Sequence, residues 1–356
     1  MVIVDFSHLS MRNLYVAISQ AKPRKVGGVF VTDDFISMYY HLMLQSLRHI
    51  SSKFDDYGEI ILALDSKNNW RRDFYPDYKG HRKKGRDQSD VDFDTFYEKV
   101  IEFGNILDEF FPYTIIQVPK AEADDIIGVI AEKFGPVENI VVVSSDKDFK
   151  QILEYGAELY DPIKKEYVRM SKDELKEWKL IHILCGDEGD NVPHIKRMTQ
   201  FTDTFKAYLK QNEIYEDDVE KFNKLSISKK LYNEFDVYKV NKKGEVLDEL
   251  DIFKATPFGP AGAKKFIVDL KDNLKANKLY AEHFKRNMKL VLFSQIPEDI
   301  RENILEAFQN KEFKYNPDGI MKFLMSENLS TQMMNITDFY VDSKKTEQGA
   351  GMREWV

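Results

Sequence analysis

Carboxylate residues follow each of four short apolar runs in the first half of the chain. The runs are residues 2–4, 60–64, 114–118 and 140–143. The carboxylates that follow them, in the same order, are Asp5; Asp65; Glu122, Asp124 and Asp125; and Asp146 and Asp148. The motif Gly186-Asp187-Glu188-Gly189-Asp190-Asn191 adds Asp187 and Asp190, which share a face if this turn is helical. So many negative charges can lie close together only if cations bind among them.

Oxygen donors of this kind select Mg²⁺, with Mn²⁺ as a substitute. The single cysteine rules out a multi-cysteine zinc site, and the seven histidines, scattered without an HExxH or HxH pairing, disfavour histidine-built zinc hydrolysis. The carboxylates exceed the needs of one ion, which predicts two metal ions about 3.5–4 Å apart, as in nucleases and polymerases. One ion would lower the pKa of an attacking water, and both would hold the scissile phosphate.

A basic segment, residues 70–86, comes soon after Asp65. Seven Arg and Lys residues and two Asp residues give it a local charge of +5, whereas the whole chain carries −8. Phosphate contacts are therefore expected to be local to such segments. Its aromatic side chains could stack on unpaired bases, as we expect for Tyr78, but we expect Trp70 and Phe74 to be buried. The basic residues are Arg71, Arg72, Lys79, Arg82, Lys83, Lys84 and Arg86.

A second candidate phosphate contact lies much later, at residues 259–265. Backbone amides at a helix start can approach a phosphate, and lysines add charge there. A Gly-Pro turn before any helix would look similar, so this signal is weak by itself. The residues concerned are Gly259, Gly262, Lys264 and Lys265.

The elements that must position these residues follow from hydrophobic patterning. The four apolar runs predict buried strands, and residues 157–160 and 166–169 predict two weaker ones. Helical patterns cover residues 33–50, 93–110 and 121–134. This alternation predicts an α/β fold with a mostly parallel central sheet and helices on both faces. The carboxyl ends of parallel strands meet at one edge, where ligands bind, so the carboxylates are expected to converge.

The chain of 356 residues is expected to have two main parts. Residues 1–190 form the α/β domain, and residues 191–340 form a helical subdomain with an insert at about 196–254, a hairpin at 238–250 and a tail at 341–356. The N-terminal apolar run is too short for a signal peptide, and no segment predicts a membrane span. One cysteine fits a reducing cytoplasm.

Each motif taken alone is also compatible with a purely structural role or with a different activity. An aspartate after a strand is often a turn former or helix N-cap, and acidic residues favour helix N-termini. A phosphatase with an Asp-x-Asp pattern would need a second carboxylate at Ser7. A different two-metal nuclease fold would not explain the late Asp187 and Asp190. A non-catalytic DNA-binding replication factor on the same fold should lack carboxylates, and none is missing here.

In order along the chain, the motifs resemble those of the flap endonuclease and 5′-nuclease family, its bacteriophage members most closely. The resemblance covers nearly the whole chain except about 196–254 and the tail. It is carried by Ile3-Val4-Asp5-Phe6-Ser7, Trp70-Arg71-Arg72-Asp73-Phe74 with Tyr78-Lys79, Glu122-Ala123-Asp124-Asp125, Ser144-Ser145-Asp146-Lys147-Asp148-Phe149 and the motif at 186–191. It implies a Mg²⁺-dependent 5′-3′ exonuclease and flap endonuclease with ribonuclease H activity. Such enzymes remove RNA primers and adjacent DNA, or 5′ flaps, during replication.

The resemblance also implies roles for individual residues. Asp5, Asp65, Asp124 and Asp146 would surround one metal ion, Asp148, Asp187 and Asp190 the second, and Glu122 and Asp125 would complete the set. Lys79 and Arg72 would meet the scissile phosphate. Residues near 70–90 would begin an arch that admits a 5′ single strand, and residues near 259–265 would form a helix-hairpin-helix that grips duplex DNA. The insert before Gly259 departs from the family pattern, in which this hairpin follows the last acidic motif directly.

The expected partners also follow from the resemblance. They are branched or nicked DNA and RNA–DNA duplex, with a single-stranded-DNA-binding protein or a sliding clamp as candidate protein partners. The protein is expected to act as a monomer in the cytoplasm, that of the host cell for a phage protein.

Overall fold

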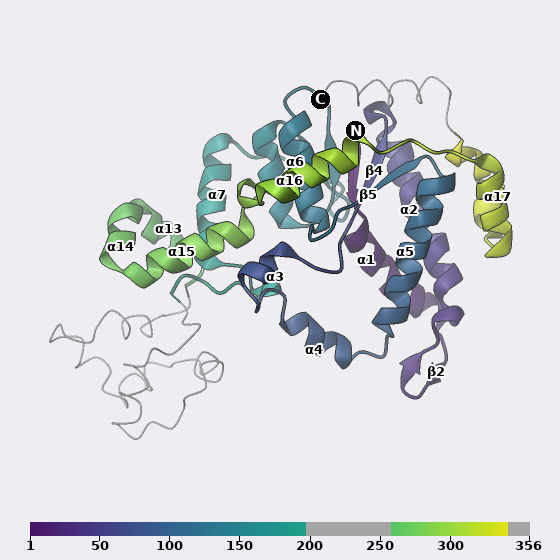
Figure 1. Ribbon diagram of the computed structural model, residues 1–356, viewed down its shortest axis with the longest axis horizontal. Helices are drawn as coiled ribbons and strands as arrows, with labels where there is room; N and C mark the ends of the chain where they lie inside the picture. Colours follow the sequence, from purple (N-terminus) through teal and green to yellow (C-terminus); the bar gives the residue numbers. More distant parts are fainter. Residues whose placement is uncertain (197–257, 341–356) are drawn as a thin grey trace. The chain divides into compact units, whose positions relative to one another are not determined.

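The computed structural model describes residues 1–196 and 258–340, except for the side chains of Lys83, Lys84 and Leu279 (Figure 1). The chain divides into two compact units, Met1–Met170 with Ile296–Val356, and Ser171–Gln295. The hairpin expected at 238–250, the tail and most of the insert lie outside the described residues.

A six-stranded sheet in the order β5-β4-β1-β6-β7-β8 forms the centre of the first unit. The strands are β1 (Val2–Asp5), β4 (Ile60–Leu64), β5 (Tyr113–Gln117), β6 (Val141–Val143), β7 (Glu158–Asp161) and β8 (Glu166–Val168). All neighbours pair in parallel except β7 and β8, which are antiparallel. Every residue of β1, β4 and β6 is buried, as expected for strands covered on both faces. The predicted fold class is therefore confirmed.

Helices cover both faces of this sheet (Figure 1). Side chains alternate along a strand, so Val2 and Val4 face one side and Ile3 the other. Val2 and Val4 pack into a core with α1 (Phe6–Ala21), α2 (Ile36–Lys53) and α5 (Phe93–Phe110). The other face carries α6 (Ala123–Phe134), against which α16 (Glu298–Gln309) packs.

The last described helices, α17 (Pro317–Ser326) and α18 (Ser330–Met334), and the 3₁₀ turn η7 (Ile336–Phe339) return to the first unit. The Phe323 ring lies 5.8 Å from that of Phe103, and the Phe339 ring 5.1 Å from that of Phe111. The expected subdomain of residues 191–340 is thus divided differently. The boundary falls after Met170, and residues 296–340 complete the core of the α/β unit.

The remaining elements in the described part of the first unit are short. They are the hairpin β2 (Lys25–Val26) and β3 (Val29–Phe30), the helices α3 (Trp70–Phe74) and α4 (His81–Asp87), and the 3₁₀ segments η1 (Thr32–Asp34), η2 (Asp55–Tyr57) and η3 (Lys147–Tyr155).

The described part of the second unit, residues 171–196 and 258–295, consists of helices packed around a small core of their own. Its described elements are α7 (Lys172–Cys185), η4 (Glu188–Asp190), α13 (Pro260–Val268), α14 (Leu270–Ala276), α15 (Lys278–Val291) and η6 (Phe293–Gln295). Leu184, Phe258 and Phe266 belong to this core. Among the helices described in either unit, none has the length and apolar character needed to cross a bilayer.

Candidate active site

The ends of β1 and β4 fix two carboxylates side by side. Asp5 closes β1 and caps α1, since its Oδ1 accepts a hydrogen bond of 2.8 Å from the His8 amide. Asp65 directly follows β4, and its own amide donates to Ser7 Oγ at 2.9 Å. Its Oδ1 accepts from the Ala123 amide at 2.8 Å, at the start of α6. The β1–α1 turn, the end of β4 and the start of α6 are therefore tied together through Asp65.

Two further carboxylates join this pair. Asp124 lies in the first turn of α6, and Asp146 caps η3, where its Oδ1 accepts from the Asp148 amide at 2.9 Å. Burial, then repulsion from Asp65 and Asp146, raises the pKa of Asp5 to about 8. Burial and the Asp5 charge likewise raise the pKa of Asp124. The four residues therefore lie close together, and we call Asp5, Asp65, Asp124 and Asp146 the carboxylate cluster.

Glu122 stands beside this cluster but has cationic partners. Its Oε1 accepts from Lys79 Nζ at 2.6 Å, and its Oε2 accepts from Arg71 Nη1 at 3.1 Å and from the Tyr78 hydroxyl at 3.0 Å. Burial alone would raise the pKa of Glu122, but Lys79 and Arg71 outweigh it and lower this pKa to about 2. Glu122 is therefore charged over the whole physiological pH range and holds the Lys79 ammonium near the carboxylate cluster.

Asp125 is fully buried and holds the other end of the same arginine. Its Oδ1 lies 2.8 Å from Arg71 Nη2, and its Oδ2 accepts from Trp70 Nε1 at 3.0 Å and from the Glu122 amide at 2.9 Å. Arg71 is 2% exposed and Tyr78 3% exposed. These burials correct the expectation that Arg71 and Tyr78 contact nucleic acid, because both are used inside the protein to hold Glu122 and Asp125.

The rest of the basic segment is divided between inside and surface. Trp70 is buried as predicted, but Phe74 is 42% exposed, which contradicts its predicted burial. Trp70, the first residue of α3, is held by its hydrogen bond to buried Asp125, whereas Phe74 is the last residue of this five-residue helix. Arg72 Nε donates to the Tyr78 carbonyl at 3.2 Å. On α4, Arg82 is exposed and Arg86 half-buried, while the predicted contacts of Lys83 and Lys84 fall on side chains outside the described set.

In the second unit, the motif at 186–191 forms a 3₁₀ turn rather than an α-helical one. Asp187 precedes this turn in extended conformation, with φ −131° and ψ 109°, so it does not share a helical face with Asp190. Gly186 has φ +69°, and a Cβ there would lie 2.2 Å from the Val192 carbonyl oxygen. Glycine is therefore required at the entry to the motif.

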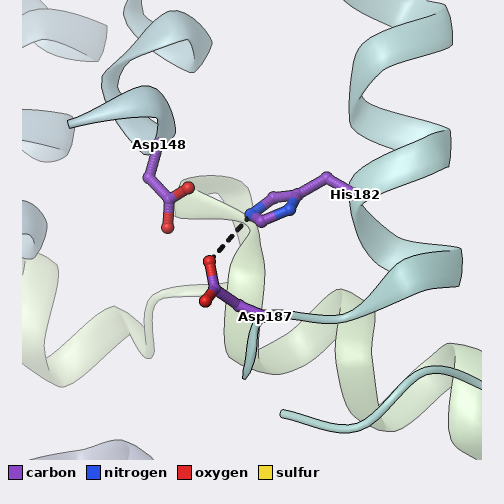
Figure 2. Close-up of side chains that lie close together, drawn as sticks. All are labelled: Asp148, His182 and Asp187. Atoms are coloured by element: carbon purple, nitrogen blue, oxygen red, sulfur yellow. Dashed lines mark ion pairs between the residues drawn. The ribbon is translucent and has the colours of Figure 1, made fainter. Parts of the chain in front are cut away.

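A histidine that the sequence motifs do not include stands beside Asp187. His182, in the last turn of α7, is buried and stacks on Trp178 with ring centroids 5.1 Å apart. Its Nε2 lies 4.0 Å from Asp187 Oδ2 (Figure 2). The sequence could have indicated this neighbour, because His182 lies only one helical turn before the acidic motif.

The glycine-lysine segment forms the expected helix start. Gly259 caps α13, and Gly262 lies inside this helix against the Phe258 ring. Lys265 is exposed, and the Lys264 ammonium lies 3.0 Å from Glu177 Oε1. The geometry is compatible with the predicted contact with DNA, which stays a prediction.

Comparison with known proteins agrees with the motifs. Residues 1–179 match the family model of the 5′-3′ exonuclease, N-terminal resolvase-like domain. The ribonuclease H of Enterobacteria phage T4 is 27% identical over 313 residues, covering 85% of this chain and 87% of that protein. Flap endonuclease Xni of Shewanella denitrificans is 28% identical over 148 residues, covering 39% of this chain and 54% of that protein.

Among solved structures, T5 5′-exonuclease with bound divalent metal ions (zinc) aligns with a TM-score of 0.46 and 15% identity, over 92% of this chain and 98% of that one. The family model spans half of this chain and contains the whole carboxylate cluster. The chain therefore belongs to the 5′-3′ exonuclease family that this N-terminal domain defines.

Proposed function

We propose that this protein is a structure-specific 5′ nuclease that hydrolyses phosphodiester bonds with divalent metal ions, Mg²⁺ in the cell, bound at the carboxylate cluster. The observation that carries the proposal is the convergence of Asp5, Asp65, Asp124 and Asp146, whose mutual repulsion helps raise the pKa of Asp5 to about 8. A bound cation would offset that repulsion. Membership of the exonuclease family supports the same conclusion.

The cluster fits Mg²⁺ because its donors are all carboxylate oxygens. Asp5, Asp65, Asp124 and Asp146 would hold the ion, which when bound lowers the pKa of an attacking water and polarises the phosphate. The prediction of a second ion with Asp148, Asp187 and Asp190 as ligands rests on the sequence motifs alone.

Lys79 is the residue that we expect to contact the scissile phosphate. Its ammonium interacts electrostatically with both Asp5 and Asp124, so it lies beside the cluster. Its side chain is only 13% exposed and is held by Glu122, and Glu122 is held in turn by Arg71. We infer that Glu122, Asp125 and Arg71 act mainly as positioning residues for Lys79. This role replaces the predicted one for each residue: Glu122 and Asp125 were expected to bind metal, and Arg71 was expected to contact phosphate.

The proposed substrates are 5′ flaps, nicked duplexes and RNA primers paired to DNA. The names of the T4 and Xni relatives, a ribonuclease H and a flap endonuclease, support this choice. Arg72, Arg82 and the other basic residues of α4 are the candidate contacts with the 5′ strand. The segment at 259–265 is the candidate contact with duplex DNA. Binding to a single-stranded-DNA-binding protein or a sliding clamp, and a cytoplasmic location, stay predictions.

Cleavage of end-labelled substrates tests the proposal. Nicked, flapped and RNA-primed duplexes, each labelled at one 5′ or one 3′ end, are incubated with the full chain in Mg²⁺, in Mn²⁺ or in EDTA. We expect products released from 5′ ends with either metal and none with EDTA. Full activity after chelation, or products released only from 3′ ends, would overturn the proposal, and tight binding without cleavage would favour a DNA-binding replication factor.

A further inference from the structure

A pocket of about 500 Å³ opens beside Asp5, in the first unit. Its walls come from α1, α2, the ends of β1 and β6, and the turn after β7. Val4 and Val143 line it from the sheet and belong to the core shared with α1 and α2. The pocket therefore lies on the sheet face that α1 and α2 cover, and Lys79, Arg72 and α4 are not among its lining residues.

The strand order places this pocket where open α/β sheets bind ligands. β1 and β6 are neighbours, but the chain leaves β1 toward β4 on one side and leaves β6 toward β7 on the other. Adjacent strands whose connections run in opposite directions leave a crevice at their carboxyl ends, where open α/β sheets bind ligands. Asp5, the last residue of β1, and Ser144, the residue after β6, both line the pocket.

The pocket carries more positive than negative charge. Arg12, Lys53 and Lys165 line it together with His8 and His49, whereas Asp5 is the one carboxylate among its described lining residues. Arg12 and Lys165 are exposed, and their side chains make no ion pair within residues 1–196 and 258–340. Cations without carboxylate partners, in a protein of net charge −8, provide a local site for an anion.

The floor of the pocket is apolar and partly aromatic. Leu9, Ile50, Phe54 and Tyr160 line it and are buried. The rings of Phe54 and Tyr160 meet edge to face at 5.2 Å, and the Lys53 ammonium lies 4.4 Å from the Tyr160 ring centroid. Pockets for small ligands typically enclose about 300–1,000 Å³ and combine such apolar walls with a few polar groups. This combination suits a ligand with one flat apolar part and one anionic part.

We propose that this pocket binds a nucleoside 5′-monophosphate unit, free or at the 5′ end of a strand. Its phosphate would contact Arg12 and Lys53, and its base would lie against Phe54 and Tyr160. The inference rests on the proposed function, because it takes the ligand to be a piece of nucleic acid. It adds a binding site to the carboxylate cluster, and this site needs no metal ion.

Calorimetric titration of the full chain with dAMP in EDTA tests the inference, with deoxyadenosine and inorganic phosphate as comparison ligands. We expect dAMP to bind more tightly than either, because only dAMP engages both the cations and the apolar floor. Arg12→Ala and Lys53→Ala should each weaken dAMP binding about tenfold, as loss of one charge-assisted contact predicts. The matched control is Lys133→Ala, an exposed lysine on α6 that does not line the pocket, and it should bind dAMP like the wild type.

A short 5′-phosphorylated oligonucleotide distinguishes the two sources of the ligand. Tighter binding than dAMP identifies a strand end as the occupant, and equal binding identifies a free nucleotide. Failure of the wild type to bind dAMP, or equal dAMP affinity in Arg12→Ala, Lys53→Ala and Lys133→Ala, would overturn the inference. Cleavage of a flapped duplex in Mg²⁺ is measured on the same wild-type preparation, so a protein that cleaves but does not bind dAMP refutes the pocket alone.

Discussion

Replacement of Asp5 by asparagine is expected to stabilise the metal-free protein at neutral pH, although Asp5 is buried in the proposed active site. The folded-state pKa of about 8 lies above the ordinary value of 3.8, so the folded protein binds more protons than the unfolded chain between these values. Stability is therefore lost as pH rises through this window. Asparagine carries no charge and can still cap α1 by accepting the hydrogen bond from the His8 amide.

The expected gain follows from the same values. A difference between pH 7 and the ordinary pKa of 3.8 corresponds to about 4 kcal/mol, at about 1.4 kcal/mol for each pH unit. Asp65 and Asp146 repel the Asp5 charge, and Asp146 also repels the Asp124 charge, so removing the Asp5 carboxyl relieves only part of the repulsion in the cluster. We therefore expect Asp5→Asn to raise the free energy of unfolding by about 1–3 kcal/mol at pH 7.

Urea unfolding in EDTA at pH 4 and pH 7.5 measures this effect. The gain should be present at pH 7.5 and nearly absent at pH 4, where both the wild type and the variant are uncharged at this position. The control is Asp92→Asn at the cap of α5, because hydrogen bonds from Thr95 lower the pKa of Asp92 and its charge therefore stabilises the fold. If Asp5→Asn is less stable than the wild type at pH 7.5, or equally stabilised at both pH values, the electrostatic reasoning is wrong.

Three further predictions concern the residues around Glu122. Arg71→Met leaves buried Asp125 without its cation and leaves Glu122 with Lys79 alone, so it should lower the free energy of unfolding by about 3–5 kcal/mol, against a small loss for Arg72→Met in the same urea titration. Equal losses would show that the buried pairs do not matter. Lys79→Ala should weaken binding of a flapped duplex, lower the slope of log Kd against log salt by about 1, and slow cleavage, and an unchanged slope would remove Lys79 from the phosphate path. The folded-state pKa of Glu122 is lowered to about 2, so charged Glu122 should contribute stability above about pH 4.5 that is lost as pH falls toward 2. Glu122→Gln should therefore reduce the loss of unfolding free energy between about pH 4.5 and about pH 2, and an unchanged loss would contradict this.

The α/β core could be predicted because each of its strands has a local signal in the sequence. Continuous apolar runs gave the central strands to within a residue or two, and the pattern at 93–110 matches the bounds of α5. The convergence of Asp5, Asp65, Asp124 and Asp146 followed from parallel strand geometry, in which strand ends meet at one edge.

Contacts between distant segments could not be predicted from local patterns. In the sequence, Arg71 is one of several cations in a basic segment that is expected at the surface. Only the fold shows that Glu122 and Asp125, which lie far later in the chain, pair with it inside the protein. The apolar face of α17 likewise indicates that the helix packs on something, but not that Phe323 joins the core of the first unit. The pattern of apolar side chains predicts which face of a helix is buried, but it does not identify the element against which that face packs.

The most direct test of catalysis at the carboxylate cluster is a comparison of wild type and Asp146→Asn on one 5′-flapped duplex. Asparagine keeps the size of the side chain and removes one charge from the cluster. Single-turnover cleavage in Mg²⁺ should fall by orders of magnitude, while Kd for the duplex in EDTA should hold or improve because repulsion of phosphate decreases. Cleavage by Asp146→Asn at the wild-type rate would show that the carboxylate cluster is not the centre of catalysis.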